Sequence, residues 1–233
     1  KIVPALAVAA CLAAPWSASA FTLVDVPTDA ALTALLGGAG EPNLSFVAEG
    51  RIGDRGGAAT HELNIGISTG SPADTDQFAW ASNQPIGFSL TYDGTTRQAQ
   101  FAFGSGTPAV AFIVPAGPRA SFTDMFFRAR SSATSSVLLS ELALDGVAFG
   151  QNVGASGGGL DFLRVADGAL DDGFTLTGRA TLSWTGAAPT NSSLAFQIKL
   201  GDAPPIPEPS TYALMLAGLA ALGFAARRRR AAV

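Results

Sequence analysis

Alternation of apolar and polar residues is the main pattern in the central part of the chain. The clearest run, FTLTGRATLSW at 174–184, keeps a period of two throughout, as a strand with one buried and one solvated face does. Nine short strands with little helical periodicity predict an all-β fold, an antiparallel β-sandwich of jelly-roll type. The other eight runs lie at 44–49, 62–68, 86–92, 98–103, 109–114, 121–130, 137–144 and 193–200.

Turn signals separate these runs. Asp93-Gly94 lies between two of the clearest runs and predicts a hairpin turn, because aspartate and glycine accept the backbone angles of tight turns. One short helix is expected over 29–36, capped by Thr28 or Asp29. No repeat of fixed period is evident, which disfavours a propeller or a solenoid. Further corners are expected at Asp145-Gly146, Asp167-Gly168 and Asp172-Gly173.

The N-terminal residues 1–20 read as a secretory signal peptide. One basic residue precedes an apolar stretch over 2–14, and the small residues of 18–20 predict cleavage between Ala20 and Phe21. An alternative takes 8–11 as a lipoprotein cleavage box that leaves Cys11 as a lipidated N-terminus. The apolar stretch continues past Cys11, which favours the first interpretation. Cys11 is the only cysteine, so the exported domain, 21–202, is expected to have neither a disulfide nor a thiol nucleophile.

The C-terminal segment combines prolines, an apolar run and arginines. The uncharged run 212–226 would form a helix of roughly 23 Å, short of a hydrocarbon core of about 30 Å. Arginines and a tyrosine at the interfaces extend such a helix, so a single transmembrane helix with a cytoplasmic arginine cluster is predicted. A buried C-terminal helix is the alternative, but the run has no polar face for water. The proline-rich stretch 203–210 disfavours helix and sheet and is expected to be extended.

The order of these features resembles the PEP-CTERM sorting signal of Gram-negative bacteria, here 203–233. The resemblance implies that an exosortase, a membrane-embedded cysteine transpeptidase, recognises the tail and removes it. The run 212–226 would then be a transient inner-membrane anchor, and the product would reach the cell surface or the extracellular matrix, in association with exopolysaccharide or biofilm. The recognition residues would be Pro207, Glu208 and Pro209, and the stop-transfer charges Arg227, Arg228, Arg229 and Arg230.

Two stretches of the domain, FSLTYDGTTRQAQFAFG and FFRARSSATSSVLLSELALDG, are similar to the choice-of-anchor domains, extracellular β-domains joined to various sorting signals. That resemblance implies no catalytic residues.

The net charge of the chain disfavours one class of partner. Residues 21–226 contain 9 basic and 18 acidic side chains, a net charge of −9. Such an acidic body is not expected to bind nucleic acid.

Three patterns resemble catalytic motifs. GASGG at 154–158 fits the G-x-S-x-G formula, but a nucleophile elbow needs a strand before Ser156 and a helix after it, and a flexible loop is expected instead. His61 precedes Glu62, yet no second histidine follows one helical turn later, so no zinc site is expected. Carboxylate pairs could serve glycoside hydrolysis, but they are expected in solvated loops. The pairs are Asp74 with Asp76 and Asp171 with Asp172.

No cofactor is expected, with a structural calcium ion as the alternative, because loop carboxylates supply the oxygen ligands that calcium prefers. Turn formation by aspartate is the simpler explanation, since no recognisable calcium loop is present. The carboxylates concerned are Asp74, Asp76, Asp161, Asp167, Asp171 and Asp172.

A sugar-binding site is expected to contain tryptophan, because a sugar face stacks on an aromatic ring. Trp80 is the candidate ligand-binding residue, with Asn83 and Gln84 nearby, and a core role is its alternative. Trp184 falls on the inward phase of its strand and is expected in the core. The first hypothesis is a non-enzymatic surface protein with a structural or adhesive role; the second is a carbohydrate-binding module, and the third is a secreted hydrolase.

Overall fold

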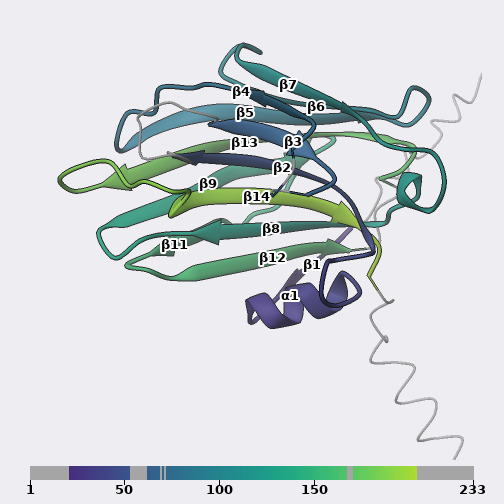
Figure 1. The fold of residues 1–233 in the computed structure, drawn as a ribbon, viewed down its shortest axis with the longest axis horizontal. Helices are drawn as coiled ribbons and strands as arrows, with labels where there is room; N and C mark the ends of the chain where they lie inside the picture. The colour runs from purple at the N-terminus through teal and green to yellow at the C-terminus, as the bar shows by residue number, and fades with distance from the viewer. Residues whose placement is uncertain (1–20, 53–61, 69, 71, 167–169, 204–233) are drawn as a thin grey trace, which may run out of the picture.

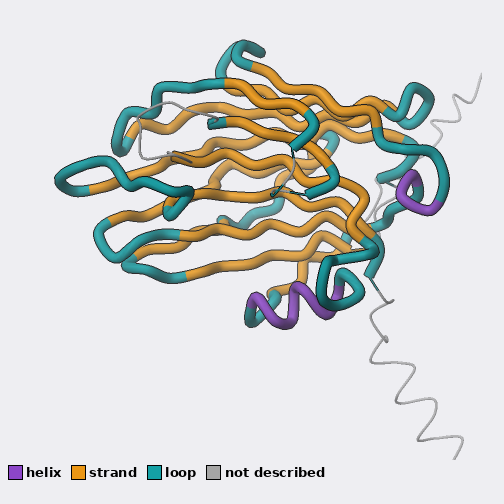
Figure 2. The backbone as a smooth tube through the Cα atoms, viewed as in Figure 1, coloured by secondary structure: helices purple, strands orange, loops and turns teal. Residues whose placement is uncertain are grey.

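The computed structural model describes residues 21–52, 62–68, 70, 72–166 and 170–203. In this part of the chain, two antiparallel sheets lie face to face (Figures 1 and 2). The all-β sandwich predicted from the sequence is therefore confirmed. The predicted signal peptide, the sorting residues 207–209, the predicted span 212–226, the arginine cluster, His61 and Asp167 lie outside the described residues.

The first sheet contains seven strands in the spatial order β1-β12-β8-β14-β2-β3-β4. The chain leaves this sheet and returns to it several times, so strands distant in sequence become neighbours; β14 pairs with both β2 and β8. The strands are β1 (Thr22–Asp25), β2 (Leu44–Ile52), β3 (Leu63–Gly66), β4 (Asp74–Asp76), β8 (Asp124–Arg130), β12 (Leu160–Ala166) and β14 (Leu194–Gly201).

The second sheet has the order β10-β9-β13-β5-β6-β7, and β11 also pairs with β9. Its longest strand, β13, pairs with β5 on one side and with β9 on the other, with a register shift between Thr177 and Arg179 on the β9 side. The strands are β5 (Gln84–Asp93), β6 (Gln98–Phe103), β7 (Ala109–Ile113), β9 (Ser135–Leu144), β10 (Val147–Ala148), β11 (Val153–Ser156) and β13 (Gly173–Trp184).

Aromatic side chains fill the space between the sheets. The rings of Phe101 and Phe103 from β6 contact Phe196 from β14, with centroids 6.2 and 6.3 Å apart. All three side chains are fully buried, and burial of a phenylalanine side chain contributes about 1.5–3 kcal/mol. The described part of the sandwich therefore gains its stability from one large apolar core.

The helix α1 (Asp29–Leu35) covers part of the outer face of the first sheet. Its Leu32 packs in a second apolar cluster with Val47 and Phe126 of that sheet. The predicted helix and its cap are confirmed: Thr28 Oγ1 accepts a hydrogen bond from the Ala31 N–H at 3.1 Å. One further turn, the 3₁₀ segment η1 (Pro118–Ala120), precedes β8.

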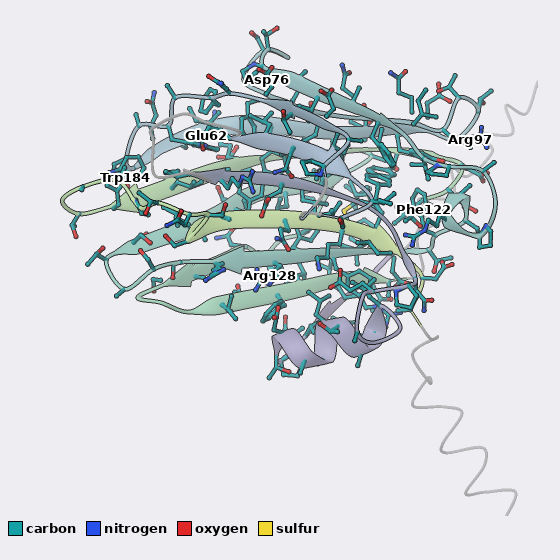
Figure 3. All side chains as sticks on the ribbon, in the orientation of Figure 1. Glu62, Asp76, Arg97, Phe122, Arg128 and Trp184 are labelled. Carbon is teal, nitrogen blue, oxygen red and sulfur yellow. The ribbon has the colours of Figure 1, made fainter. Side chains whose placement is uncertain are left out.

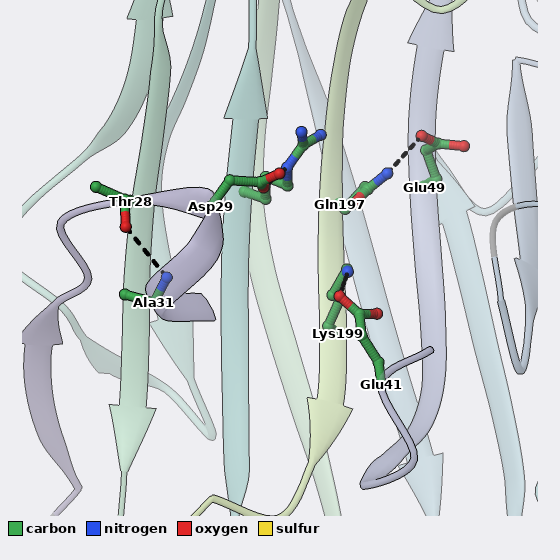
Figure 4. Close-up of polar contacts among 8 residues, drawn as sticks. Thr28, Asp29, Ala31, Glu41, Glu49, Gln197 and Lys199 are labelled. Carbon is green, nitrogen blue, oxygen red and sulfur yellow. Dashed lines mark hydrogen bonds and ion pairs between the residues drawn. The ribbon is translucent and has the colours of Figure 1, made fainter. Parts of the chain in front are cut away.

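Polar pairs occupy another part of that outer face (Figure 4). Gln197 on β14 donates to Glu49 on β2 at 3.0 Å, and Lys199 pairs with Glu41. Glu49 is buried, and an unpaired buried charge is costly. Its carboxylate also accepts from Asn64 at 3.1 Å and from Arg51 at 3.3 Å. Gln197, Asn64 and Arg51 together pair the Glu49 carboxylate.

All nine predicted strand runs are confirmed, with ends shifted by a few residues. The hairpin at Asp93-Gly94 is also confirmed, since β5 ends at Asp93 and β6 begins at Gln98. Two expected loops are wrong. Asp74 and Asp76 lie in β4, because their backbone pairs with β3, and 153–156 form β11, because they pair with β9.

Candidate ligand-binding cleft

A cleft of about 470 Å³ opens at one end of the sandwich, where Figure 3 labels Trp184. Three segments that are distant in sequence form it: 82–83 before β5, 133–136 at the start of β9, and 183–185 at the end of β13. Its volume is within the range of small-molecule sites, about 300–1,000 Å³. The lining residues are Ser82, Asn83, Ala133, Thr134, Ser135, Ser136, Ser183, Trp184 and Thr185.

Ser82 fixes the backbone of Trp184 from one side of the cleft. The Ser82 Oγ accepts a hydrogen bond from the Trp184 N–H at 2.9 Å and donates to the Trp184 carbonyl at 3.0 Å. The Asn83 N–H donates to the Leu182 carbonyl at 2.9 Å. Asn83 has a φ of 65°, a left-handed conformation that asparagine tolerates better than most residues. The segment before β5 is therefore anchored to the end of β13.

The opposite wall is joined to β13 by β-pairing that continues to the last residue of the strand. Trp184 lies opposite Ser135 in the register of β13 and β9, and the Thr185 N–H donates to the Thr134 carbonyl at 3.1 Å. Ser135 Oγ accepts the Ser132 N–H at 2.8 Å. Both walls are held by hydrogen bonds, so the cleft is built into the fold.

Trp184 both supports the core and faces the cleft. It is half-buried and packs against the main core cluster, and it also lines the cleft. The expectation of a core residue is correct in part, because alternation places Trp184 inward. β13 ends at this residue, however, so the end of the sandwich leaves part of the ring uncovered.

The chemistry of the cleft is neutral and polar. None of its nine lining side chains carries a charge, and seven carry a hydroxyl or a carboxamide. Hydroxyls and amides can donate and accept hydrogen bonds, while the indole offers a flat apolar face. A charged ligand would find no counter-charge among these side chains, whereas a neutral polyhydroxylated ligand would find both hydrogen-bonding groups and a stacking surface.

Trp80 lies elsewhere. Its ring meets those of Phe78 and Phe103 at centroid distances of 4.9 Å each, and its indole N–H donates to the Arg51 carbonyl at 3.0 Å. Trp80 does not line the cleft, although Asn83, which accompanied it in the sequence hypothesis, does. Trp80 is half-buried and packs against the core cluster, as Trp184 does, and Trp184 is the tryptophan that lines the cleft.

Ser156 does not lie in a strand-turn-helix arrangement. It ends β11, opposite Ser136 of β9, and Gly157 and Gly158, with φ values of 62° and 87°, turn the chain into strand β12. The Asp161 carboxylate accepts the Gly154 N–H at 2.7 Å and so belongs to the same turn. The glycines of the G-x-S-x-G formula serve a tight turn between two strands.

The acidic pairs also have structural partners. Asp74 accepts the N–H of Ala111 at 2.8 Å, and Asp76 accepts that of Gln77 at 2.8 Å. Asp171 lies 3.3 Å from the Ser121 hydroxyl. Among the residues described, no three His, Cys, Asp or Glu side chains come together as a metal site would require.

Comparison with known families finds the PEP-CTERM protein-sorting motif at residues 205–230. The sorting signal predicted from the sequence is thereby confirmed. Such signals are recognised by exosortase, and the motif indicates an exported protein of the surface or extracellular space with a C-terminal membrane-anchoring segment. The match leaves the sandwich domain itself unassigned, and the choice-of-anchor resemblance stays a prediction.

No curated protein matches the chain significantly. Within the described ranges, no helix has the length and apolar character needed to cross a bilayer.

Proposed function

We propose that the sandwich is an adhesive domain that holds a neutral exopolysaccharide chain in the Trp184 cleft after delivery by the exosortase pathway. The observation that carries this proposal is the lining of the cleft: one half-buried tryptophan among hydroxyl and amide groups, with no charged side chain. A sugar presents both an apolar face and a rim of hydroxyls, and this lining complements both.

The position of the cleft supports an adhesive role. It opens at the end of the sandwich (Figure 3), where a long polymer can enter without threading through the domain. The Trp184 N–H donates to the Ser82 hydroxyl and the Thr185 N–H donates to the Thr134 carbonyl. Because these bonds join the walls of the cleft, little ordering is required on binding. A preformed site loses less affinity to conformational entropy.

We also propose that the domain is not an enzyme. The lining side chains of the cleft include no carboxylate, imidazole or amine, so none of them can act as a general acid or base near neutral pH. Ser156 lies in a strand and turn and has the environment of a structural residue. Its substitution by alanine is expected to change no hydrolytic activity of the purified protein.

Binding is tested with the exported domain and a panel of immobilised polysaccharides, neutral (dextran, mixed-linkage β-glucan, galactomannan) and anionic (alginate, polygalacturonate). We expect retention on at least one neutral polymer and a loss of about tenfold or more with Trp184→Ala, because loss of about 1.4 kcal/mol of contact lowers affinity tenfold. Ile113→Ala is the matched control, since it removes an exposed apolar side chain from β7. Retention on no neutral polymer, or retention unaffected by Trp184→Ala, contradicts the proposal.

Processing is tested separately by mass spectrometry of the protein from cells that contain an exosortase. The mature chain is expected to lack Arg227, Arg228, Arg229 and Arg230. A mature C-terminus that still carries these four residues would indicate a permanent membrane anchor instead of a transient one.

A further inference from the structure

The last described residues are held firmly to the sandwich. The Thr123 N–H donates to Asp202 Oδ1 at 3.1 Å, and the Ala203 N–H donates to Asp124 Oδ2 at 3.1 Å. Asp124 is itself fully buried and pairs with Arg164 at 2.7 Å. The chain therefore leaves the folded domain at a fixed point, Ala203, which we call the tail root.

The tail root and the cleft lie at opposite ends of the sandwich. Asp171, just before β13, contacts Ser121, two residues from the Thr123 that holds Asp202. The start of β13 is thus at the root end, whereas its last residue, Trp184, lines the cleft (Figure 3). At about 3.3 Å per residue, the 12 residues of β13 separate the two ends by roughly 36–40 Å.

The tether between the tail root and the predicted span is shorter than this separation. Residues 204–211 lie between Ala203 and the apolar run 212–226. Eight residues reach at most about 26–29 Å even when fully extended. A domain tethered so closely cannot turn its far end toward the bilayer, because the sandwich would have to fit, end on, into a gap shorter than itself.

We propose that, while the tail still holds the chain in the membrane, the tail root faces the bilayer and the Trp184 cleft faces away from it. The surface around Ser121 and Asp202 is then the one nearest the bilayer. The cleft is open to polymer before the tail is removed, so glycan capture does not wait for processing. This last consequence rests on the function proposed above; the orientation does not.

Orientation is measured on the full chain in a bacterial host without exosortase, so that the tail is retained. Cys11→Ser removes the only cysteine of the sequence, and single cysteines are then placed at two exposed positions, Ser121→Cys at the root end and Thr185→Cys beside the cleft. A bulky membrane-impermeant maleimide is added to spheroplasts and to the same protein in detergent. We expect Thr185→Cys to react equally fast in both, and Ser121→Cys to react several-fold more slowly in the membrane.

A spacer provides the matched control. An insertion of about 20 glycine and serine residues after Ala203 gives a flexible tether and is expected to restore the reactivity of Ser121→Cys in the membrane. Slow modification of Thr185→Cys, or equal rates at both positions without the spacer, would overturn the orientation.

Binding by the anchored chain separates this inference from the proposed function. Membrane-held protein is expected to retain the same neutral polysaccharide as the soluble domain, with a similar affinity. Binding in solution that is lost in the membrane would refute the outward-facing cleft and leave the proposed function intact. Correct labelling without binding in either form would refute the function and leave the orientation intact.

Discussion

Asp74 and Ala111 join the two sheets at their edges. The Asp74 Oδ2 atom, on the last strand of the first sheet, accepts the N–H of Ala111, on the last strand of the second sheet, at 2.8 Å. Strands β4 and β7 are both outermost strands, and unpaired N–H groups on outermost strands invite association with other chains. The carboxylate occupies one such group and closes this side of the sandwich.

Replacing Asp74 tests this connection. Asp74→Ala removes a hydrogen bond to a charged acceptor, which contributes about 1.5–3 kcal/mol, and the half-buried site favours the lower part of that range. We expect Asp74→Asn to lose less, because its carbonyl oxygen can still accept the bond. Urea unfolding measures both, and amide exchange at Ala111 should accelerate in the alanine variant.

Asp76→Ala is the control for that experiment. Asp76 lies on the same strand, but its carboxylate accepts only the adjacent Gln77 N–H among its described contacts, so a loss below about 1 kcal/mol is expected. Equal losses in the free energy of unfolding for Asp74→Ala and Asp76→Ala would show that the hydrogen bond between the sheets adds no stability.

Nine strands were predictable, including β2 and β14, which are buried along almost their whole length, whereas β12 and β4 were not. The strand β13 shows alternation of buried and exposed residues along most of its length. In β12, by contrast, the last five residues are all buried, because Phe162 packs under α1 while Leu163 faces the core. Its pattern therefore has no period of two. The strand β4 reads Asp-Thr-Asp and is defined by its pairing with β3, which no local pattern reveals.

The chemical character of the candidate site could be predicted from the sequence, but its location could not. Sugar recognition predicts a tryptophan beside polar side chains, and the cleft has that composition. The choice between Trp80 and Trp184 depends on what covers each ring, and therefore on packing. Two phenylalanine rings contact the half-buried Trp80, whereas Trp184 ends its strand beside segments 82–83 and 133–136, which only the tertiary fold brings together.

The two tryptophans are expected to respond differently to substitution. Trp80→Phe keeps an aromatic ring between Phe78 and Phe103 but loses the hydrogen bond to the Arg51 carbonyl, so stability should fall by about 1 kcal/mol while polysaccharide binding stays unchanged. Urea unfolding and retention on the neutral polymer measure the two effects. Loss of binding in Trp80→Phe at unchanged stability would instead make Trp80 a ligand-binding residue.

Calcium is expected to leave the stability of the exported domain unchanged. Four of the carboxylates considered as calcium ligands, Asp74, Asp76, Asp161 and Asp171, accept backbone or hydroxyl hydrogen bonds. A bound ion at 100 times its Kd would add about 2.7 kcal/mol, or roughly 5–11 °C for a domain of this size. Thermal unfolding with excess calcium and with EGTA distinguishes the cases, and a difference above about 5 °C would establish a structural calcium site.

Asp202 and Asp93 are expected to affect stability with opposite signs as pH changes. Burial raises the pKa of Asp202 above its ordinary value of 3.8, against the hydrogen bond from the Thr123 N–H. The folded state thus binds this proton more tightly than the unfolded state, so the carboxylate lowers stability as pH rises through its pKa. Asp202→Asn keeps an acceptor without the charge and should unfold at a higher temperature than wild type at pH 7.

For Asp93 the backbone N–H of Thr96, with that of Thr95, lowers the pKa below 3.8. Its carboxylate therefore stabilises the β5–β6 hairpin above the unfolded pKa, and the contribution disappears as pH falls through the lower folded value. Asp93→Asn should unfold at a lower temperature than wild type at pH 7. Thermal unfolding between pH 7 and pH 2 measures the difference in unfolding temperature between each variant and wild type. Both differences should become smaller in acid, the one for Asp202→Asn being positive and the one for Asp93→Asn negative. Shifts of the same sign for the two variants would contradict the assignment of burial to Asp202 and of hydrogen bonding to Asp93.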